Sequence, residues 1–158
     1  MLRALPGSGP HPVTLLASVI IPAYNAAASI VACLEALAHQ TLAAGDFEVI
    51  VVDDGSTDTT PRVAEQFGVR VVRGTHGGPT AARNLGASLA TGRFLVFTDA
   101  DCVPEPDWAE QMLRPLLTTD AVGVKGVYRT HQRSLTARFA QVEFEEKYRR
   151  LASAASID

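Results

Sequence analysis

Short apolar runs rich in β-branched residues alternate along this chain with segments of helical pattern, and this alternation limits the fold more than any other feature. The runs that we predict as strands are 18–21, 47–52, 69–72, 94–98 and 122–127. The segments that we predict as helices are 29–39, 58–67, 80–90, a stretch that begins at 106, and 134–152. Strands that alternate with helices build βαβ units, whose strands run parallel. The pattern therefore predicts an α/β fold with a mostly parallel sheet and helices on both faces.

The composition supports a folded domain and excludes several classes of protein. Hydrophobic residues make up 47% and charged residues 20% of the 158 residues, which is typical of a globular chain. The formal net charge of −3 offers no positive surface for nucleic acid. The longest apolar runs are shorter than the roughly 18 residues that span a membrane. We divide the chain into a flexible leader (1–16), an α/β domain (17–130) and a last region with a long helix (131–158).

Two groups of acidic residues directly follow predicted strands. They are Asp53-Asp54, after 47–52, and Asp99-Ala100-Asp101, after 94–98. In an open α/β sheet, ligands bind at the carboxyl ends of the strands, so we expect these acids at one edge. Neighbouring carboxylates oppose each other's ionisation unless a cation lies between them. Oxygen ligands of this kind suit Mg²⁺ or Mn²⁺, so the pattern favours a divalent metal site and a ligand that carries phosphate.

Each candidate also has a structural interpretation, which the sequence leaves open. Asp53-Asp54 fit an ordinary turn, after which Asp58, or the Thr59-Thr60 pair, opens the next helix. Tyr24 could belong to the core or stack on a nucleobase. Arg83 could lie on a solvated helix face or reach back to the edge of the sheet.

Four motifs stand out in order along residues 18–104. They are Ser18-Val19-Ile20-Ile21-Pro22-Ala23-Tyr24-Asn25, Val51-Val52-Asp53-Asp54-Gly55-Ser56-Thr57-Asp58, Ala82-Arg83-Asn84-Leu85-Gly86 and Phe97-Thr98-Asp99-Ala100-Asp101. In this order and spacing they resemble the motifs of the inverting family 2 glycosyltransferases, which have a GT-A fold with a Rossmann-like sheet. The resemblance implies a UDP- or GDP-linked sugar as donor, a hydroxyl group as acceptor, and Mg²⁺ or Mn²⁺ as cofactor.

The resemblance also implies roles at the base end of the donor. Tyr24 and Asp54 would line the pocket for the base, with Asp54 as a hydrogen-bond acceptor. Asp53 would support that loop, and Arg83 would contact the base or its surroundings.

At the phosphate end, the resemblance places Asp99 near the ribose and the metal, and Asp101 as a ligand of the metal that bridges the diphosphate. The predicted substrate-binding set is Pro22, Tyr24, Asp53, Asp54, Arg83, Asp99, Ala100 and Asp101, with Asp99 and Asp101 as metal ligands.

Transfer also needs a general base that deprotonates the acceptor hydroxyl, and the resemblance places this acid well downstream of Asp101. The chain ends at Asp158 before such a segment is complete, and a terminal residue is usually poorly ordered. We therefore expect an N-terminal donor-binding part that is truncated and incomplete at its C-terminus. It would keep donor binding, lack the general base and leave the catalytic residues unknown.

The predicted helix 134–152 is apolar on more than one face. This favours packing against further structure; self-association and docking on a membrane surface through its basic residues are the alternatives. Cys33 and Cys102 have no metal-binding spacing, so we expect free thiols in a cytoplasmic protein. The last helix could bring that protein to the inner face of the membrane.

The sequence leaves two other functions open. Without a general base, the chain could bind nucleotide sugars without turning them over. A phosphoacceptor receiver domain also combines an acidic pair, a later aspartate and a lysine; Lys125 lies on the predicted run 122–127, although it follows Asp101 too soon. A dinucleotide-binding fold is excluded because no G-x-G-x-x-G joins a strand to a helix. The acceptor, a glycan, a lipid or a small molecule, is not identified by the sequence.

Overall fold

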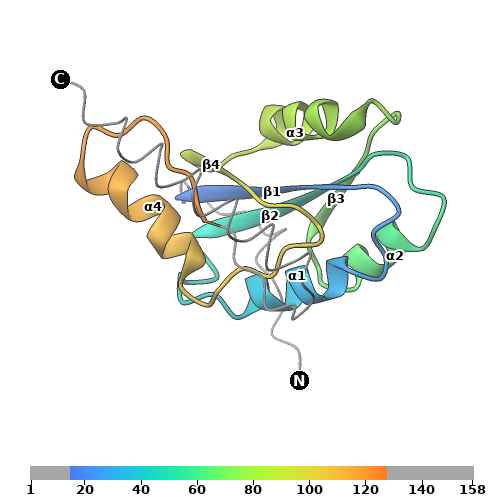
Figure 1. Cartoon of the computed structure of the whole chain (residues 1–158), viewed down its shortest axis with the longest axis horizontal. Coiled ribbons are helices and arrows are strands. Elements are labelled where there is room, and N and C mark those ends of the chain that lie inside the picture. Colours follow the sequence, from blue (N-terminus) through green and yellow to red (C-terminus); the bar gives the residue numbers. More distant parts are fainter. Residues whose placement is uncertain (1–14, 128–158) are drawn as a thin grey trace, which may run out of the picture. The chain divides into compact units, whose positions relative to one another are not determined.

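Four of the predicted strands form one parallel sheet in the computed structural model, which describes residues 15–127 (Figure 1). They are β1 (Ala17–Ala23), β2 (Phe47–Asp53), β3 (Arg70–Arg73) and β4 (Phe94–Phe97). The strand order is β3-β2-β1-β4, and every neighbouring pair is parallel. The predicted mostly parallel sheet is confirmed.

The central strands owe their apolar sequences to their place in this sheet. Every residue of β1 and β2 is buried, and parallel strands that are covered on both faces are typically continuous apolar runs. Within residues 15–127, the strands β3 and β4 each pair on one side only, and both are partly exposed.

Helices cover both faces of the sheet (Figure 1). The helix α3 (Gly78–Leu89) lies on one face, and α1 (Ile30–Ala38), α2 (Thr60–Glu65) and α4 (Trp108–Thr118) lie on the other. Alternate side chains of a strand point to opposite faces. In β1, Val19 and Ile21 therefore enter the larger core with α1 and α4, while Ile20 enters the smaller core with α3.

The register brings the carboxyl ends of β1, β2 and β4 to one edge of the sheet. Ala23 pairs with Asp53, and the N–H of Asp54 donates to the carbonyl of Ala23 at 2.8 Å. On the other side of β1, Ile20 pairs with Phe97, the last residue of β4. The residues that follow these three strands therefore lie at one edge of the sheet, which is where we expect the two acidic groups from their positions after predicted strands.

The prediction of a fifth strand over 122–127 is wrong, because these residues form neither strand nor helix. Gly123 and Gly126 interrupt the apolar run, and glycine weakens a strand because it contributes no side chain to pack. Lys125 consequently does not lie on a strand. The phosphoacceptor receiver domain, the alternative that placed this lysine on a strand, is therefore not supported by the structure.

The chain divides into two compact units, Met1–Ala121 and Val122–Asp158. Most of the predicted leader (1–16) and the whole of the predicted helix 134–152 lie outside the described residues. No helix within residues 15–127 is long and apolar enough to cross a membrane.

Candidate functional site

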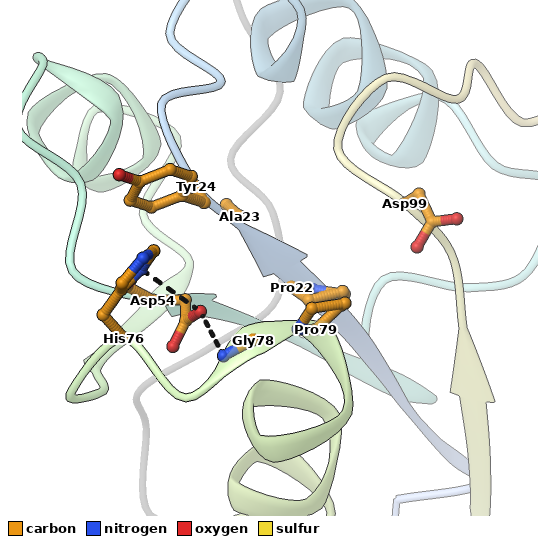
Figure 2. Close-up of a pocket in the computed structure, with 8 residues that line it drawn as sticks. All are labelled: Pro22, Ala23, Tyr24, Asp54, His76, Gly78, Pro79 and Asp99. Carbon is orange, nitrogen blue, oxygen red and sulfur yellow. Dashed lines mark hydrogen bonds and ion pairs between the residues drawn. The ribbon is translucent and has the colours of Figure 1, made fainter.

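A pocket with a volume of about 190 Å³ opens at the carboxyl edge of the sheet (Figure 2). Its lining residues are Pro22, Ala23, Tyr24, Asp54, His76, Gly78, Pro79 and Asp99. They come from the end of β1 and the residue after it, from the residue after β2, from the segment before α3 and its first two residues, and from the loop after β4. Four residues of the predicted set, Pro22, Tyr24, Asp54 and Asp99, thus line one pocket.

Asp54 is held by the first turn of α3. The residue is only 4% exposed, and its Oδ1 and Oδ2 accept hydrogen bonds from the N–H groups of Gly77 and Gly78, both at 2.8 Å. Such N–H groups carry partial positive charge at a helix N-terminus, so they stabilise a buried carboxylate. Gly78 has φ +85°, a conformation that glycine adopts without strain.

Tyr24 and His76 form an aromatic wall of the pocket (Figure 2). Their ring centroids lie 4.4 Å apart with the planes at 36°. Tyr24 is 48% exposed, so it does not belong to the core. His76 Nδ1 lies 2.9 Å from the carbonyl oxygen of Asp54 and 3.7 Å from its Oδ2. Sequence reasoning misses His76; the signal that could find it is its position directly before the two glycines that open α3.

Arg83 reaches from α3 to the loop after β4, where its Nη2 lies 2.5 Å from Asp99 Oδ1. Of the two interpretations of Arg83, the structure supports the one in which it reaches the edge of the sheet. The side chains are 35% and 42% exposed, so water screens the pair and its contribution to stability is small. Its main effect is to orient the carboxylate of Asp99. Arg83 does not itself line the pocket.

Asp99, Asp101 and Cys102 bring potential metal ligands together, because one side-chain ligand atom of each lies within 4.8 Å of the others. Carboxylate oxygens suit Mg²⁺ and Mn²⁺, which keep some water or phosphate ligands. Asp101 is exposed, which leaves its carboxylate open to such ligands. The Cys102 Sγ, 3.8 Å from Asp101 Oδ1, is a softer ligand. The two carboxylates therefore fit a hard divalent cation.

Asp53 and Ala100 of the predicted set are buried and do not line the pocket, and the exposed Asp101 does not line it either. Asp53 is 2% exposed, and its Oδ1 accepts a hydrogen bond from the N–H of Ser56 at 3.1 Å, which holds the turn after β2. Ala100 is buried in the larger core. Asp58 accepts a hydrogen bond from the N–H of Thr60 at 2.9 Å, in a turn before α2, while Thr59 is the residue at the N-cap position of the helix.

Both cysteines of the described residues are free thiols, as predicted. Burial raises the pKa of the Cys33 thiol to about 12, and its S–H donates to the carbonyl of Asp99 at 3.6 Å. Burial also raises the pKa of the Cys102 thiol. Because the thiolate is the reactive form, burial of this kind lowers the reactivity of both cysteines at neutral pH.

Comparison with known proteins extends this picture. The model of glycosyl transferase family 2 matches residues 18–155. Glycosyltransferase AglE of Haloferax volcanii is 40% identical over 113 residues, which are 68% of this chain and 36% of AglE.

Two solved structures have a similar fold. TarS of S. aureus, in complex with UDP-GlcNAc, matches with a TM-score of 0.64 and 28% identity over 76% of this chain and 39% of TarS. The mannosyltransferase PcManGT of Pyrobaculum calidifontis, in complex with GDP-Man and Mn²⁺, matches with a TM-score of 0.55 and 32% identity over 59% of this chain and 29% of that protein. The chain thus spans well under half the length of these relatives. The predicted GT-A fold is confirmed, and the chain belongs to glycosyl transferase family 2.

Proposed function

We propose that the pocket binds the nucleotide part of a nucleotide-diphosphate sugar, and that the protein transfers the sugar to an acceptor hydroxyl with inversion. The observation that carries this proposal is the convergence of Tyr24, Asp54 and Asp99 on one pocket at the carboxyl edge of the sheet. TarS in complex with UDP-GlcNAc and PcManGT in complex with GDP-Man support a donor of this class.

The base would lie at the end of the pocket that Tyr24 and Asp54 form. The exposed ring of Tyr24 offers a stacking face, and such stacking contributes about 1–3 kcal/mol per base in single-stranded nucleic-acid sites. Each oxygen of Asp54 accepts one backbone hydrogen bond. Because a carboxylate oxygen can accept more than one, Asp54 can also accept a hydrogen bond from an N–H of the base.

The diphosphate would lie toward Asp99 and Asp101. These carboxylates would hold Mg²⁺ or Mn²⁺, and Mn²⁺ accompanies GDP-Man in the PcManGT structure. When bound, the cation would supply Lewis-acid stabilisation of the negative charge on the departing nucleoside diphosphate. Arg83 orients Asp99 and adds a positive charge at the same place.

The acceptor half of the reaction is not assigned to any residue within 15–127. The acceptor would be a glycan, a lipid or a small molecule with a free hydroxyl. A general base outside the described residues would take up the hydroxyl proton.

Isothermal titration calorimetry with UDP and GDP, each with and without Mn²⁺, tests the donor site. We expect at least one of the two to bind about tenfold more tightly with Mn²⁺, a gain of about 1.4 kcal/mol. Asp101→Asn should abolish that gain because it removes a charged ligand. The matched control Asp120→Asn changes an exposed aspartate outside the pocket and should leave binding unaltered.

Two results would contradict parts of this proposal. Binding that does not depend on Mn²⁺ and survives Asp101→Asn would overturn the metal assignment. Failure of both nucleotides to bind would overturn the donor site itself.

Release of the nucleoside diphosphate from a panel of UDP- and GDP-linked sugars separates an enzyme from a non-catalytic binder. We expect slow release that requires Asp101, in which water takes the place of the acceptor and the products are the free sugar and the nucleoside diphosphate, because the cation that stabilises the leaving group does not depend on the acceptor. Donor binding without any release would leave nucleotide-sugar binding as the function of this chain.

A further inference from the structure

Residues 25–27, which directly follow Tyr24, are hydrogen-bonded to the segment after β2. The parallel pairing of β1 and β2 brings the two segments together, although they lie 31 to 34 positions apart in the chain. Three consecutive backbone N–H groups donate to side-chain oxygens of this segment: Asn25 to Ser56 Oγ at 2.9 Å, Ala26 to Thr60 Oγ1 at 2.8 Å, and Ala27 to Asp58 Oδ2 at 3.2 Å.

Asn25 also takes part with its side chain. Its Oδ1 accepts hydrogen bonds from the N–H of Thr57 at 2.9 Å and from the Thr57 hydroxyl at 3.3 Å. Its backbone lies in the left-handed region at φ +48°, which asparagine and aspartate adopt more readily than most residues. Asn25 therefore both permits this turn of the backbone and binds it to the neighbouring loop.

The same hydrogen bonds reach the turn at the end of β2. Ser56, which accepts from the N–H of Asn25, donates through its own N–H to Asp53 Oδ1 at 3.1 Å. Asp53 is the last residue of β2 and is buried. The loop after β1 is thus connected through Ser56 to a fixed point in the sheet.

The backbone on both sides of Tyr24 is held in this way, whereas its ring is half exposed. Before Tyr24, the carbonyl of Ala23 accepts from the N–H of Asp54 at 2.8 Å. After it come the hydrogen bonds of Asn25. The ring packs against His76, whose side chain is itself 60% exposed. Because an exposed partner restrains a ring only weakly, the direction of the Tyr24 side chain depends mainly on its backbone.

We infer that Asn25 is a positioning residue for the base of the donor. Asn25 does not line the pocket; it acts through Tyr24, by holding the backbone that directs the ring toward the base. A ring that already has its bound orientation loses less conformational entropy when the ligand binds. The inference rests on the proposed function, because it requires a nucleotide base against Tyr24.

Two substitutions at Asn25 separate its side-chain hydrogen bonds from its backbone conformation. Asn25→Gly keeps the left-handed backbone but removes the acceptor for Thr57. In calorimetry with UDP and GDP in the presence of Mn²⁺, it should weaken binding about three- to tenfold for whichever nucleotide the unmodified chain binds. Asn25→Asp keeps the backbone tolerance and a side-chain oxygen that can accept from Thr57, so it should retain most of the affinity.

Ser56→Ala tests the same link from the opposite loop. It removes the oxygen that accepts from the N–H of Asn25 and leaves the backbone N–H that donates to Asp53. We expect a loss of nucleotide affinity similar to that of Asn25→Gly.

A double-mutant cycle with Tyr24→Ala tests whether Asn25 acts through the ring. Tyr24→Ala should weaken nucleotide binding more than Asn25→Gly does, because it removes the stacking face itself. The further addition of Asn25→Gly should then cause little additional loss, since residues that act as a unit are not additive. A merely structural role of Asn25 would give the same fold-loss with and without the Tyr24 ring.

Thr119→Ala is the matched control. Its Oγ1 also accepts from a backbone N–H in an exposed turn, that of Ala121 at 3.1 Å, but Thr119 does not line the pocket. Its substitution should leave nucleotide binding unaltered. Urea unfolding establishes that each variant is folded under the conditions of the calorimetry.

Three results would overturn the inference and leave the donor site intact. They are unchanged affinity in both Asn25→Gly and Ser56→Ala, equal losses for Asn25→Gly and Asn25→Asp, and the same loss in the presence and absence of the Tyr24 ring. Failure of both UDP and GDP to bind the unmodified chain would overturn the donor site, and this inference with it.

Discussion

Glu48, at the start of β2, is a buried acid whose charge is stabilised by its hydrogen bonds. It is 8% exposed, and its Oε1 accepts hydrogen bonds from the Ser18 hydroxyl and from the N–H and hydroxyl of Thr91, all at 2.7 Å. Burial by itself raises the pKa of Glu48, but the bonds from Thr91 and Ser18 outweigh that effect and hold the pKa below its ordinary value.

We predict that this network makes folding depend on pH. A pKa that is lower in the folded state stabilises the fold above the ordinary glutamate pKa of about 4.3, and this stabilisation is lost as the pH falls through the folded-state value. Glu48→Gln should therefore lower the free energy of unfolding at pH 7 by about 1–3 kcal/mol. The difference from the unmodified chain should shrink toward pH 3.

Urea unfolding at pH 7, 5 and 3 measures this effect. The control Glu65→Gln changes an exposed residue and should show neither the loss nor its pH dependence. A difference for Glu48→Gln that stays constant from pH 7 to pH 3 would contradict the role of its charge.

At the scale of elements, the side chain of Gln40 links the end of α1 to the start of α4, beside a backbone hydrogen bond from the N–H of Thr41 to the carbonyl of Pro106 at 2.8 Å. Gln40, just after α1, donates through Nε2 to the carbonyl of Glu105 at 2.7 Å, and its Oε1 accepts from the N–H of Ala109 at 2.9 Å. The start of α4 is thereby held in place, and the helix presents Leu113 to the larger core while Leu117 is exposed.

We predict that the two leucines differ sharply in their contribution to stability. Leu113 is 1% exposed and Leu117 is 48% exposed. Leu113→Ala should cost about 2–5 kcal/mol because it opens a cavity in the core, and Leu117→Ala should change stability by less than about 0.5 kcal/mol. The fluorescence of Trp108, the one tryptophan in the sequence, can follow unfolding. Equal losses for both variants would show that α4 does not pack as described.

At the scale of the whole molecule, the packing of α3 on the sheet is linked to the pocket. A Cβ at Gly86 would lie 2.5 Å from Ile20 Cγ2 and 3.1 Å from Val52 Cγ2, so α3 approaches β1 and β2 too closely for any larger residue. The same helix begins at the amide groups that hold Asp54 and carries Arg83. The position of α3 therefore sets the geometry of the pocket.

We predict that Gly86→Ala lowers stability and nucleotide binding together. Overpacking of this kind typically costs about 1–3 kcal/mol of stability. A displaced α3 would also move the backbone N–H groups that donate hydrogen bonds to Asp54. Urea unfolding and calorimetry measure the two effects. Gly45→Ala is the control, because a Cβ at Gly45 meets no atom within 4 Å. Normal nucleotide binding by a destabilised Gly86→Ala variant would show that the geometry of the pocket does not depend on the packing of α3.

Much of the fold could be predicted because its signals are local. The four observed strands begin and end within two residues of the predicted bounds, since β-branched runs such as Val49–Val52 specify buried parallel strands. The run 122–127 carried a similar local pattern but forms no strand. Pairing depends on packing with neighbours, which a local pattern does not contain.

The sequence by itself determined the order of the elements, the family resemblance and the acids at the carboxyl ends of β2 and β4. Each of these depends only on a short contiguous stretch of residues. Only the tertiary structure decided which of these residues share the pocket. Asp53 and Ala100 are buried and do not line it, Arg83 pairs with Asp99, and His76, which belongs to no motif, packs against Tyr24. The physical reason is that such contacts join residues distant in the chain, and their geometry depends on how α3 packs against the sheet.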